Sequence, residues 1–510
     1  MATLKSLRDE RLRKLQEIKN LGIDPYPADA NRTNYLFEIQ SNFKDFVGKE
    51  VSVVGRIKGI RKIGKIAFIA IHDSSGDLQL FLRDNQVKAD SAGKTYLDFS
   101  KINLLDVGDF IQASGKVIKT QTGEISVEVE KLKLLTKSLR SMPTSHDGFT
   151  NKEERLRRRY VDLNINPDVY ERFIRRSKFW QSTRDFLIEN GFIEINIPVL
   201  EHTTGGADAK PFVTHMDSLN QDFYLRISQE LPLKRLLGGG YEKVFDIGPR
   251  FRNENYSDEH LPEHIAMEWY WAYADWQDGM EFTQNLFRAI CDKTWGKRTF
   301  EINDMDKIDL GKDGEDWPKV SFIEIIKKEF NIDVFESTMD QIKTKLKENK
   351  LEVAKEDNRA RSIDKLWKKL RTEITGPTYL IDIPVFLQPL AKAQKLDPRL
   401  SEQFNLILAG TELCKAYSEL NDPIDQLSRF LEQRDMRDAG DEEAQMLDID
   451  FVEMLEFGMP PACGFGFTER VFWTLENVTA REGVPFPHLR QEVDSVTKSI
   501  YPDVFTKKQK

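Results

Sequence analysis

The chain has 510 residues, 40% of them hydrophobic and 31% charged, and a formal net charge of −9. This length allows two or three domains with cores of their own, and the acidic balance argues against a protein that coats nucleic acid through a broad basic surface. No apolar run reaches the length of a membrane helix, no secretory leader is apparent, and the three cysteines form no C-x-x-C pair, so we expect a cytoplasmic protein without membrane contact, disulfide framework or thiolate metal site.

The first 20 residues have apolar side chains at helical spacing and more basic than acidic side chains, which predicts an amphipathic helix. It would begin an N-terminal helical extension of residues 1–48. The basic side chains are Lys5, Arg8, Arg11, Arg13, Lys14 and Lys19. Two interpretations stay open, a local contact with nucleic acid or a helix docked on the protein with a solvated polar face.

Five segments with period-two alternation follow and are separated by turns that contain glycine. They cover residues 51–57, 66–71, 77–81, 110–115 and 125–130. This pattern predicts a five-stranded barrel of the OB kind in residues 49–140. Such barrels often present aromatic side chains to single-stranded bases, which makes Phe68 a candidate contact; the alternative is that Phe68 lies in the core.

Residues 141–160 are polar and basic and predict a linker before a second domain, residues 161–510. A helix predicted over residues 169–190 ends at Gly191. Short extended segments come next without regular alternation of strand and helix, which favours an α+β fold with an antiparallel sheet and flanking helices. Residues 301–375 are charged and helical in period, so we expect a helical insertion there rather than a continuation of the sheet.

The stretch of residues 241–254 contains an apolar strand followed by Arg252 and Glu254. An arginine can neutralise phosphate and a carboxylate can accept from an amine, which suits an ATP site without a phosphate-binding glycine loop. Downstream, His260, Glu263 and His264 match H-x-x-E-H, a zinc protease signature that requires a helix. Pro262 would break that helix at a cost of about 3 kcal/mol, which leaves a zinc protease as a remote alternative.

Residues 241–254 resemble motif 2 of class II aminoacyl-tRNA synthetases, and residues 191–198 resemble motif 1, whose strand forms a dimer interface. More of the chain is similar to the lysyl-tRNA synthetases of subclass b. The segments that carry this similarity are residues 21–27, 132–139, 205–212, 224–236 and 417–422. The last of these, around Ser418-Glu419-Leu420-Asn421-Asp422, is absent from the related aspartyl and asparaginyl enzymes.

The resemblance implies a lysine–tRNA ligase with L-lysine, ATP and tRNA(Lys) as substrates, Mg²⁺ as cofactor and a homodimeric assembly. Glu419 and Tyr270 would hold the ε-ammonium of lysine. The other side chains and backbone expected to bind lysine are Gly206, Glu230, Glu268 and Tyr417. A buried carboxylate that needs a cation would reject uncharged side chains.

For the nucleotide, the resemblance implies catalytic roles for Arg252 and Arg470 on the phosphates. The remaining residues expected at ATP are Glu254, His260, His264 and Glu412. Glu412 would bind the metal ion, with Asn405 as a second, poorer ligand. In the barrel, Phe68 would stack on the central anticodon base, Gln79 would hydrogen-bond it, and Arg56 would contact the backbone.

The chain departs from the family pattern in the nucleotide half of the site. An arginine is replaced by Glu259, a phenylalanine by His264, a second metal-binding glutamate by Asn405 and an asparagine by Lys415, and motif 3 around residues 464–470 is one residue short. A shortened strand would reverse side-chain parity unless a bulge restored it. These differences leave open a paralogue that activates lysine or another amine without charging tRNA.

Overall fold

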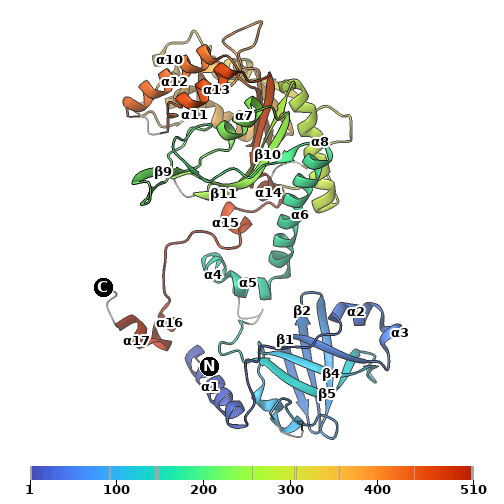
Figure 1. Ribbon diagram of the computed structural model, residues 1–510. Coiled ribbons are helices and arrows are strands. Elements are labelled where there is room, and N and C mark those ends of the chain that lie inside the picture. Colours follow the sequence, from blue (N-terminus) through green and yellow to red (C-terminus); the bar gives the residue numbers. More distant parts are fainter. Residues whose placement is uncertain are drawn as a thin grey trace. The chain divides into compact units, whose positions relative to one another are not determined.

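The computed structural model describes residues 3–90, 94–143, 149–254, 257–303, 305, 307–354, 357–440 and 443–506. It forms two compact units, Met1–Asn151 with Arg490–Lys510, and Lys152–Leu489 (Figure 1). The chain from Arg490 onward therefore groups with the N-terminal unit, whereas the sequence assigned it to the second domain. The contact is polar and aromatic, since the Arg8 guanidinium lies 5.3 Å from the centre of the Tyr501 ring. No helix in the described ranges is long and apolar enough to cross a membrane.

A closed five-stranded barrel with strand order β1-β2-β3-β5-β4 forms the centre of the N-terminal unit, which confirms the predicted OB-type barrel. Its strands are β1 (Glu50–Ile63), β2 (Ile66–Asp73), β3 (Gly76–Arg83), β4 (Phe110–Lys119) and β5 (Ile125–Thr136). β3 and β5 pair in parallel and the other neighbours are antiparallel. Short helices accompany it: α2 (Leu36–Ser41), α3 (Phe43–Phe46), η1 (Phe99–Leu104), α16 (Ser495–Ile500) and α17 (Pro502–Thr506).

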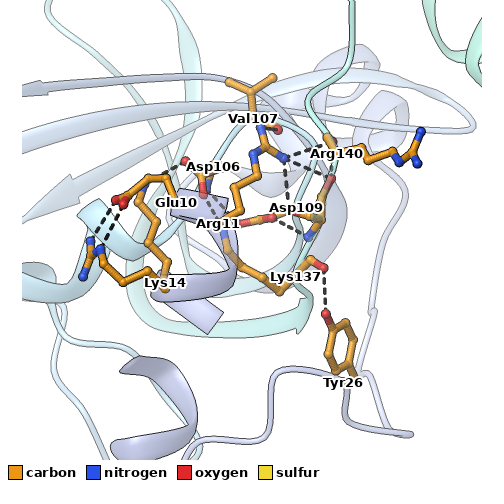
Figure 2. A network of polar contacts seen from close by, with 11 residues as sticks. Glu10, Arg11, Lys14, Tyr26, Asp106, Val107, Asp109, Lys137 and Arg140 are labelled. Carbon is orange, nitrogen blue, oxygen red and sulfur yellow. Dashed lines mark hydrogen bonds and ion pairs between the residues drawn. The ribbon is translucent and has the colours of Figure 1, made fainter. Parts of the chain in front are cut away.

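Helix α1 (Leu4–Asn20) is docked on this unit by buried polar contacts (Figure 2). Arg11 is 8% exposed and donates hydrogen bonds to the carbonyl oxygens of Val107 and Arg140 at 2.9 and 3.1 Å. Lys14 pairs with Asp106 at 2.8 Å. Two of the basic side chains are thus used inside the unit, which favours the docked interpretation over contact with nucleic acid.

The second unit contains an eight-stranded sheet with order β14-β15-β16-β17-β18-β11-β10-β6. Its strands are β6 (Ile193–Glu194), β10 (Lys243–Phe251), β11 (Glu263–Ala272), β14 (Lys319–Ser321), β15 (Thr378–Ile381), β16 (Gln403–Leu408), β17 (Thr411–Ser418) and β18 (Ala462–Thr468). The inner strands are antiparallel and only the two edge pairs, β14 with β15 and β6 with β10, are parallel. This confirms the predicted α+β class.

Helices and small sheets surround this central sheet. The helices outside the insertion are α4 (Lys152–Arg157), α5 (Arg159–Ile165), α6 (Pro167–Glu189), α7 (Glu230–Gly238), α8 (Trp276–Trp295), α12 (Pro423–Asp438), α13 (Ile449–Phe457), α14 (Arg470–Leu475), α15 (Ala480–Gly483) and η3 (Val385–Leu387). The small sheets consist of β7 (Leu200–Glu201), β8 (Val213–Met216), β9 (Gln221–Leu225), β12 (Thr299–Phe300) and β13 (Ile308–Asp309). α4 and α5 occupy part of the predicted linker, where the buried Asp162 accepts from Arg159 at 2.7 Å and stabilises the helical turn.

Strand alternation gives the central sheet two different faces. Trp269 and Phe465 point into one apolar core, whereas Tyr270 and Tyr417 belong to the core on the opposite side. Because β11 and β18 pair in register, Gly464 and Gly466 lie on the same face as Tyr270. That face carries the site described below.

The insertion contains three helices, α9 (Phe322–Phe330), α10 (Met339–Glu348) and α11 (Arg359–Leu370), with a short 3-10 turn, η2 (Arg371–Glu373). They enclose an apolar core of their own. The expectation of a purely helical insertion was incomplete, because β14 within it pairs with β15 and forms the edge of the main sheet. Three residues are too short for an alternating pattern to be visible in the sequence.

Candidate active site

Two adjoining pockets open on the face of the sheet formed by β10, β11, β17 and β18. The first encloses about 190 Å³. Among its lining residues are all of those expected at ATP, namely Arg252, Glu254, His260, His264, Glu412 and Arg470. They come from the connection between β10 and β11, from β11 itself, from β17 and from the start of α14, so the fold gathers a cationic and imidazole-rich pocket from three parts of the chain.

Arg470 begins α14 and lies beside His260, with 2.8 Å between Arg470 Nη2 and His260 Nε2. Burial lowers the pKa of the His260 imidazole and of the Arg470 guanidinium, and nearby arginines lower both pKa values further. A neutral imidazole can accept from the guanidinium, so His260 holds Arg470 without competing for an anion. The charge of Arg470 is therefore left for phosphate.

His264 lies on β11 and accepts a hydrogen bond from Arg250 Nε at 3.0 Å, while its Nδ1 is 3.2 Å from the Leu261 carbonyl oxygen. Burial and the neighbouring Arg250 and Arg252 hold the pKa of His264 well below its usual range. The ring is thus neutral, with the proton on Nδ1. The zinc protease alternative is wrong, because Pro262 precedes a strand rather than lying within a helix, and both nitrogens of His264 already have protein partners.

The side chains of Asn405 on β16 and Glu412 on β17 are hydrogen-bonded, and Asn405 Nδ2 donates to Glu412 Oε2 at 3.3 Å. The other oxygen of Glu412 accepts from the Trp367 indole of the insertion helix α11. The amide oxygen of Asn405 accepts from Gln403 at 2.8 Å. Among the residues that the structure describes, no group of three or more histidine, cysteine or acidic side chains could hold a metal ion.

The carboxylate of Glu412 would suit a magnesium ion that takes its other ligands from a nucleotide and from water. Mg²⁺ commonly uses one or two carboxylates together with substrate phosphates and water rather than a cage made of protein atoms. Glu412 supplies such a carboxylate at the wall of the first pocket. Asn405 is a poorer ligand because its amide oxygen carries no formal charge, whereas the Glu412 carboxylate does, and because that oxygen already accepts from Gln403.

The second pocket encloses about 270 Å³ and is lined by most of the residues expected at lysine. These are Gly206, Glu230, Glu268, Tyr270 and Tyr417. Gly206 has φ +83°, and a Cβ there would come within 2.7 Å of the Glu230 Cβ, so a side chain would be strained and would crowd the pocket. Its backbone can therefore approach a ligand closely.

Glu268 and Glu230 are both buried and hydrogen-bonded at the floor of this pocket. Glu268 Oε1 accepts from Ser228 at 2.8 Å and Arg250 at 3.1 Å, and its Oε2 accepts from the Tyr270 hydroxyl at 3.1 Å. Burial raises the pKa of Glu268, an effect that Arg250 opposes. Glu230 Oε1 accepts from the Tyr417 hydroxyl at 2.6 Å.

Glu419 lies directly behind the pocket and is 1% exposed. Its Oε2 makes an ion pair with Lys234, while Oε1 has no hydrogen-bond partner among the described residues. A Cβ on Gly464 would lie 2.0 Å from that oxygen and 2.5 Å from the Tyr270 ring, so only glycine leaves this space open. A buried carboxylate oxygen without a partner is costly, and a small cation placed there would remove the cost.

Four residues line both pockets: Arg250, Arg252, Lys415 and Gly466. Three of them are cations, so positive charge is concentrated where the pockets meet. The Lys415 ammonium is 3.0 Å from the Gln388 side-chain oxygen. A reacting carboxylate and phosphate brought together at this junction would find cations on several sides.

Sequence reasoning missed Arg250 and Lys234 as members of the site. Arg250 stands two residues before Arg252, and that spacing on a strand places both side chains on one face. Lys234 follows Glu230 by four residues, the spacing at which helical side chains are neighbours. Both signals were present in the sequence but resemble ordinary surface pairs.

The shortened motif 3 keeps its parity without a bulge in β18. Residues 462–468 pair in unbroken register with β11, and residues 463–467 do so with β17. A register shift occurs instead between β16 and β17, between Leu406 and Ile407. The strand therefore keeps Gly464 and Gly466 on the pocket face.

The residues expected at the anticodon lie on the outer face of the barrel. Phe68 is half-buried and stacks on Phe81 with ring centres 5.2 Å apart, while its neighbours Ala67 and Ile69 are buried, so Phe68 is not a core residue. Gln79 is on the same face and donates to Ser126 at 2.9 Å.

Arg56 lies on β1, whereas Phe68 is on β2 and Gln79 on β3, and its guanidinium is 4.2 Å from the centre of the Phe110 ring. Burial lowers its pKa. Its side chain thus makes an internal cation–π contact, apart from the Phe68 and Gln79 pair.

Comparisons with known proteins agree with this arrangement. Residues 151–490 match the family of tRNA synthetases class II (D, K and N), and residues 51–135 match the OB-fold nucleic acid binding domain. The chain is 40% identical to a lysine–tRNA ligase of Fervidobacterium nodosum over 96% of its length and 95% of that protein. It is 41% identical to one of Thermotoga maritima, covering 95% of this chain and 96% of the relative, and 40% identical to one of Carboxydothermus hydrogenoformans, covering 96% and 98%.

Proposed function

This chain belongs to the tRNA synthetases class II (D, K and N), and we propose that it is a lysine–tRNA ligase that activates L-lysine with ATP and transfers it to tRNA(Lys). One observation supports lysine as the amino acid above the others. Glu419 is buried behind the second pocket with an unpartnered oxygen, and the Gly464 backbone leaves room beside it. An ε-ammonium has the charge and size for that place, whereas an uncharged side chain would leave the carboxylate buried and unpaired.

The reaction needs no protein nucleophile. A carboxylate oxygen of lysine forms a bond to the α-phosphorus of ATP, and the bond from that phosphorus to the oxygen bridging the α- and β-phosphates breaks. The products are lysyl-adenylate and pyrophosphate. A ribose hydroxyl at the 3′ end of tRNA then attacks the lysyl carbonyl carbon, and AMP leaves. The protein contributes by positioning the substrates and by neutralising developing charge, for which Arg252 at the junction and Arg470 in the first pocket are suited.

His260 and His264 would complete the nucleotide site. The neutral His264 ring, held by Arg250, offers a flat surface to adenine, and His260 orients Arg470. Glu254 lines the same pocket and could accept from the adenine amine. Magnesium, when bound with ATP, would withdraw charge from the phosphates, and Glu412 would hold it with Asn405 as a poorer neighbour.

The barrel would bind the anticodon through its outer face. Phe68 offers a half-exposed ring and Gln79 an amide on the same face. Base stacking on an aromatic side chain contributes roughly 1–3 kcal/mol per base. Arg56 would contact the backbone only by leaving the Phe110 ring, which makes it the least supported of the three.

We also propose a homodimer that works in the cytoplasm, where tRNA is charged. The edge strand β6 pairs with β10 on one side only among the described residues, and Ile193 on it is 51% exposed. An exposed edge with an apolar side chain favours pairing with a second copy.

Two assays test the proposal. Lysine-dependent exchange of pyrophosphate into ATP should occur with the purified protein, and lysine should be transferred to tRNA(Lys) in a second assay. Absence of lysine-dependent exchange would contradict the proposal, and exchange without transfer would indicate the paralogue that does not charge tRNA.

A further inference from the structure

Lys234 is a buried cation behind the lysine pocket that the mechanism above does not use. It lies on α7, one helical turn after Glu230, and its side chain is 0% exposed. Its ammonium is 2.6 Å from Glu230 Oε1 and makes an ion pair with Glu419 Oε2. Removing an ammonium from water is costly, so a lysine in this position requires compensation from its neighbours.

The surroundings of Lys234 include several of the groups that would bind the substrate. The Tyr417 and Phe451 ring centres lie 5.6 and 5.9 Å from its ammonium. The Tyr417 hydroxyl donates to the same oxygen of Glu230 that Lys234 contacts. Lys234 thus joins the carboxylate at the pocket floor to the carboxylate behind it.

The charges around Glu419 do not cancel. Glu230 and Glu419 are buried carboxylates that share the single ammonium of Lys234, whereas Glu268 is paired with Arg250. One negative charge is therefore left over beside Glu419, and the ε-ammonium of lysine carries one positive charge at neutral pH.

The position of the excess charge is also defined. Lys234 occupies Oε2 of Glu419, so the unpartnered oxygen is Oε1, which faces Gly464 and the Tyr270 ring. Without Lys234, both oxygens would be unpaired and the carboxylate could rotate or take up a proton. An ion pair on one oxygen fixes the direction of the other.

We propose that Lys234 is a specificity-determining residue of the lysine pocket, whose ammonium fixes Glu419 and balances the pocket charge so that a side chain with a single positive charge is accepted. The inference rests on the proposed function and deepens it. Lys234 itself need not touch the substrate, because it acts through the Glu419 and Glu230 carboxylates.

Electrostatics gives the expected pH behaviour. The titratable groups around Glu419 are Lys234, Glu230, Glu268, Tyr270, Tyr417 and Cys463. Burial raises the pKa of Glu419 well above its usual range, Glu230 and Glu268 raise it further, and Lys234 is the group that lowers it. Loss of the Lys234 charge should therefore allow Glu419 to hold a proton at neutral pH and to lose it only at higher pH.

The test uses two variants of the full-length protein and a matched control. Lys234→Met removes the charge and keeps the length, and Lys234→Gln removes the charge but keeps hydrogen-bond donors. The control is Arg235→Met, which neutralises the next residue of the same helix, where the guanidinium pairs with Asp448 outside the pocket. Pyrophosphate exchange is measured with lysine and with norleucine, which has the same chain without the ε-amine, across pH, and folding is checked by thermal melting.

Both Lys234 variants should raise the KM for lysine at neutral pH by roughly 30-fold or more, leave the KM for ATP near wild type, and reduce the preference for lysine over norleucine. The KM for lysine should recover toward wild type as pH rises, and Arg235→Met should behave as wild type. A change below about threefold, a rise in KM that is equal at every pH, or failure of both variants to fold would overturn the proposal. Wild-type protein without lysine-dependent exchange would instead contradict the proposed function.

Discussion

Replacing Glu419 with glutamine tests the side-chain pocket most directly. In the structure the two carboxylate oxygens have separate tasks, since Oε2 faces Lys234 and Oε1 is unpartnered beside Gly464. Glutamine keeps the shape but has one oxygen and an N–H₂ group. Either Lys234 or the incoming ε-ammonium would then meet a donor instead of an acceptor, so a charged contact is lost whichever way the amide turns.

Loss of one partner of a buried charged pair costs about 2–5 kcal/mol, which corresponds to roughly 30- to 4,000-fold in binding. We expect kcat/KM for lysine in pyrophosphate exchange to fall within this range. The KM for ATP should change less than about threefold, because Glu419 does not line the nucleotide pocket. The exposed Glu456 on α13 provides a control, Glu456→Gln, with wild-type kinetics. A fall of less than about tenfold for Glu419→Gln would refute this assignment of the pocket.

Four further predictions concern the barrel, the pH dependence of lysine binding, the junction of the two pockets and the dimer. Phe68→Ala should weaken charging of tRNA and leave exchange with free lysine intact, and equal loss in both assays would indicate a structural role. Because burial raises the pKa of Glu419 and Lys234 lowers it, lysine binding should weaken as pH falls, at a lower pH in wild type than in the Lys234 variants, and a lysine KM that does not rise on acidification would contradict this. The ammonium of Lys415 at the junction should neutralise part of the phosphate charge that a magnesium ion would otherwise neutralise. Wild type should then saturate with fewer magnesium ions than a Lys415→Asn, Asn405→Glu double variant, which should remain active. An equal magnesium order in the two proteins would argue against this role of Lys415. Light scattering in the micromolar range should give twice the chain mass of 59.2 kDa, and a monomer at all concentrations would exclude the dimer.

Much of the fold follows from local patterns in the sequence. Period-two alternation predicted the barrel, because Ala67, Ile69 and Ile71 must all face inward, and the structure confirms it. The helix predicted over residues 169–190 is α6, which ends before Gly191 at φ +82°. These features depend on residues close together in the sequence, because the period of apolar side chains differs between a strand and a helix.

Long-range contacts were beyond such reasoning. Lys234 and Glu419 meet because α7 packs against β10 and β11, and Glu419 directly follows β17 of the same sheet. Nothing in the sequence of either segment indicates that the other is its neighbour. Trp367 reaches Glu412 from the insertion for the same reason. The resemblance to a family supplied the individual residues expected at lysine and ATP, but it did not show which side chains hold them in place.

The return of the chain from Arg490 onward to the N-terminal unit has a consequence for the order of folding during synthesis. Helix α16 contacts α1, yet the whole of Lys152–Leu489 is translated between them. The barrel can close as soon as β5 has left the ribosome, since all of its strands precede Thr136. The surface of α1 that receives α16 stays uncovered until Arg490 and the residues that follow it have been synthesised, so this contact can form only after the second unit has been translated.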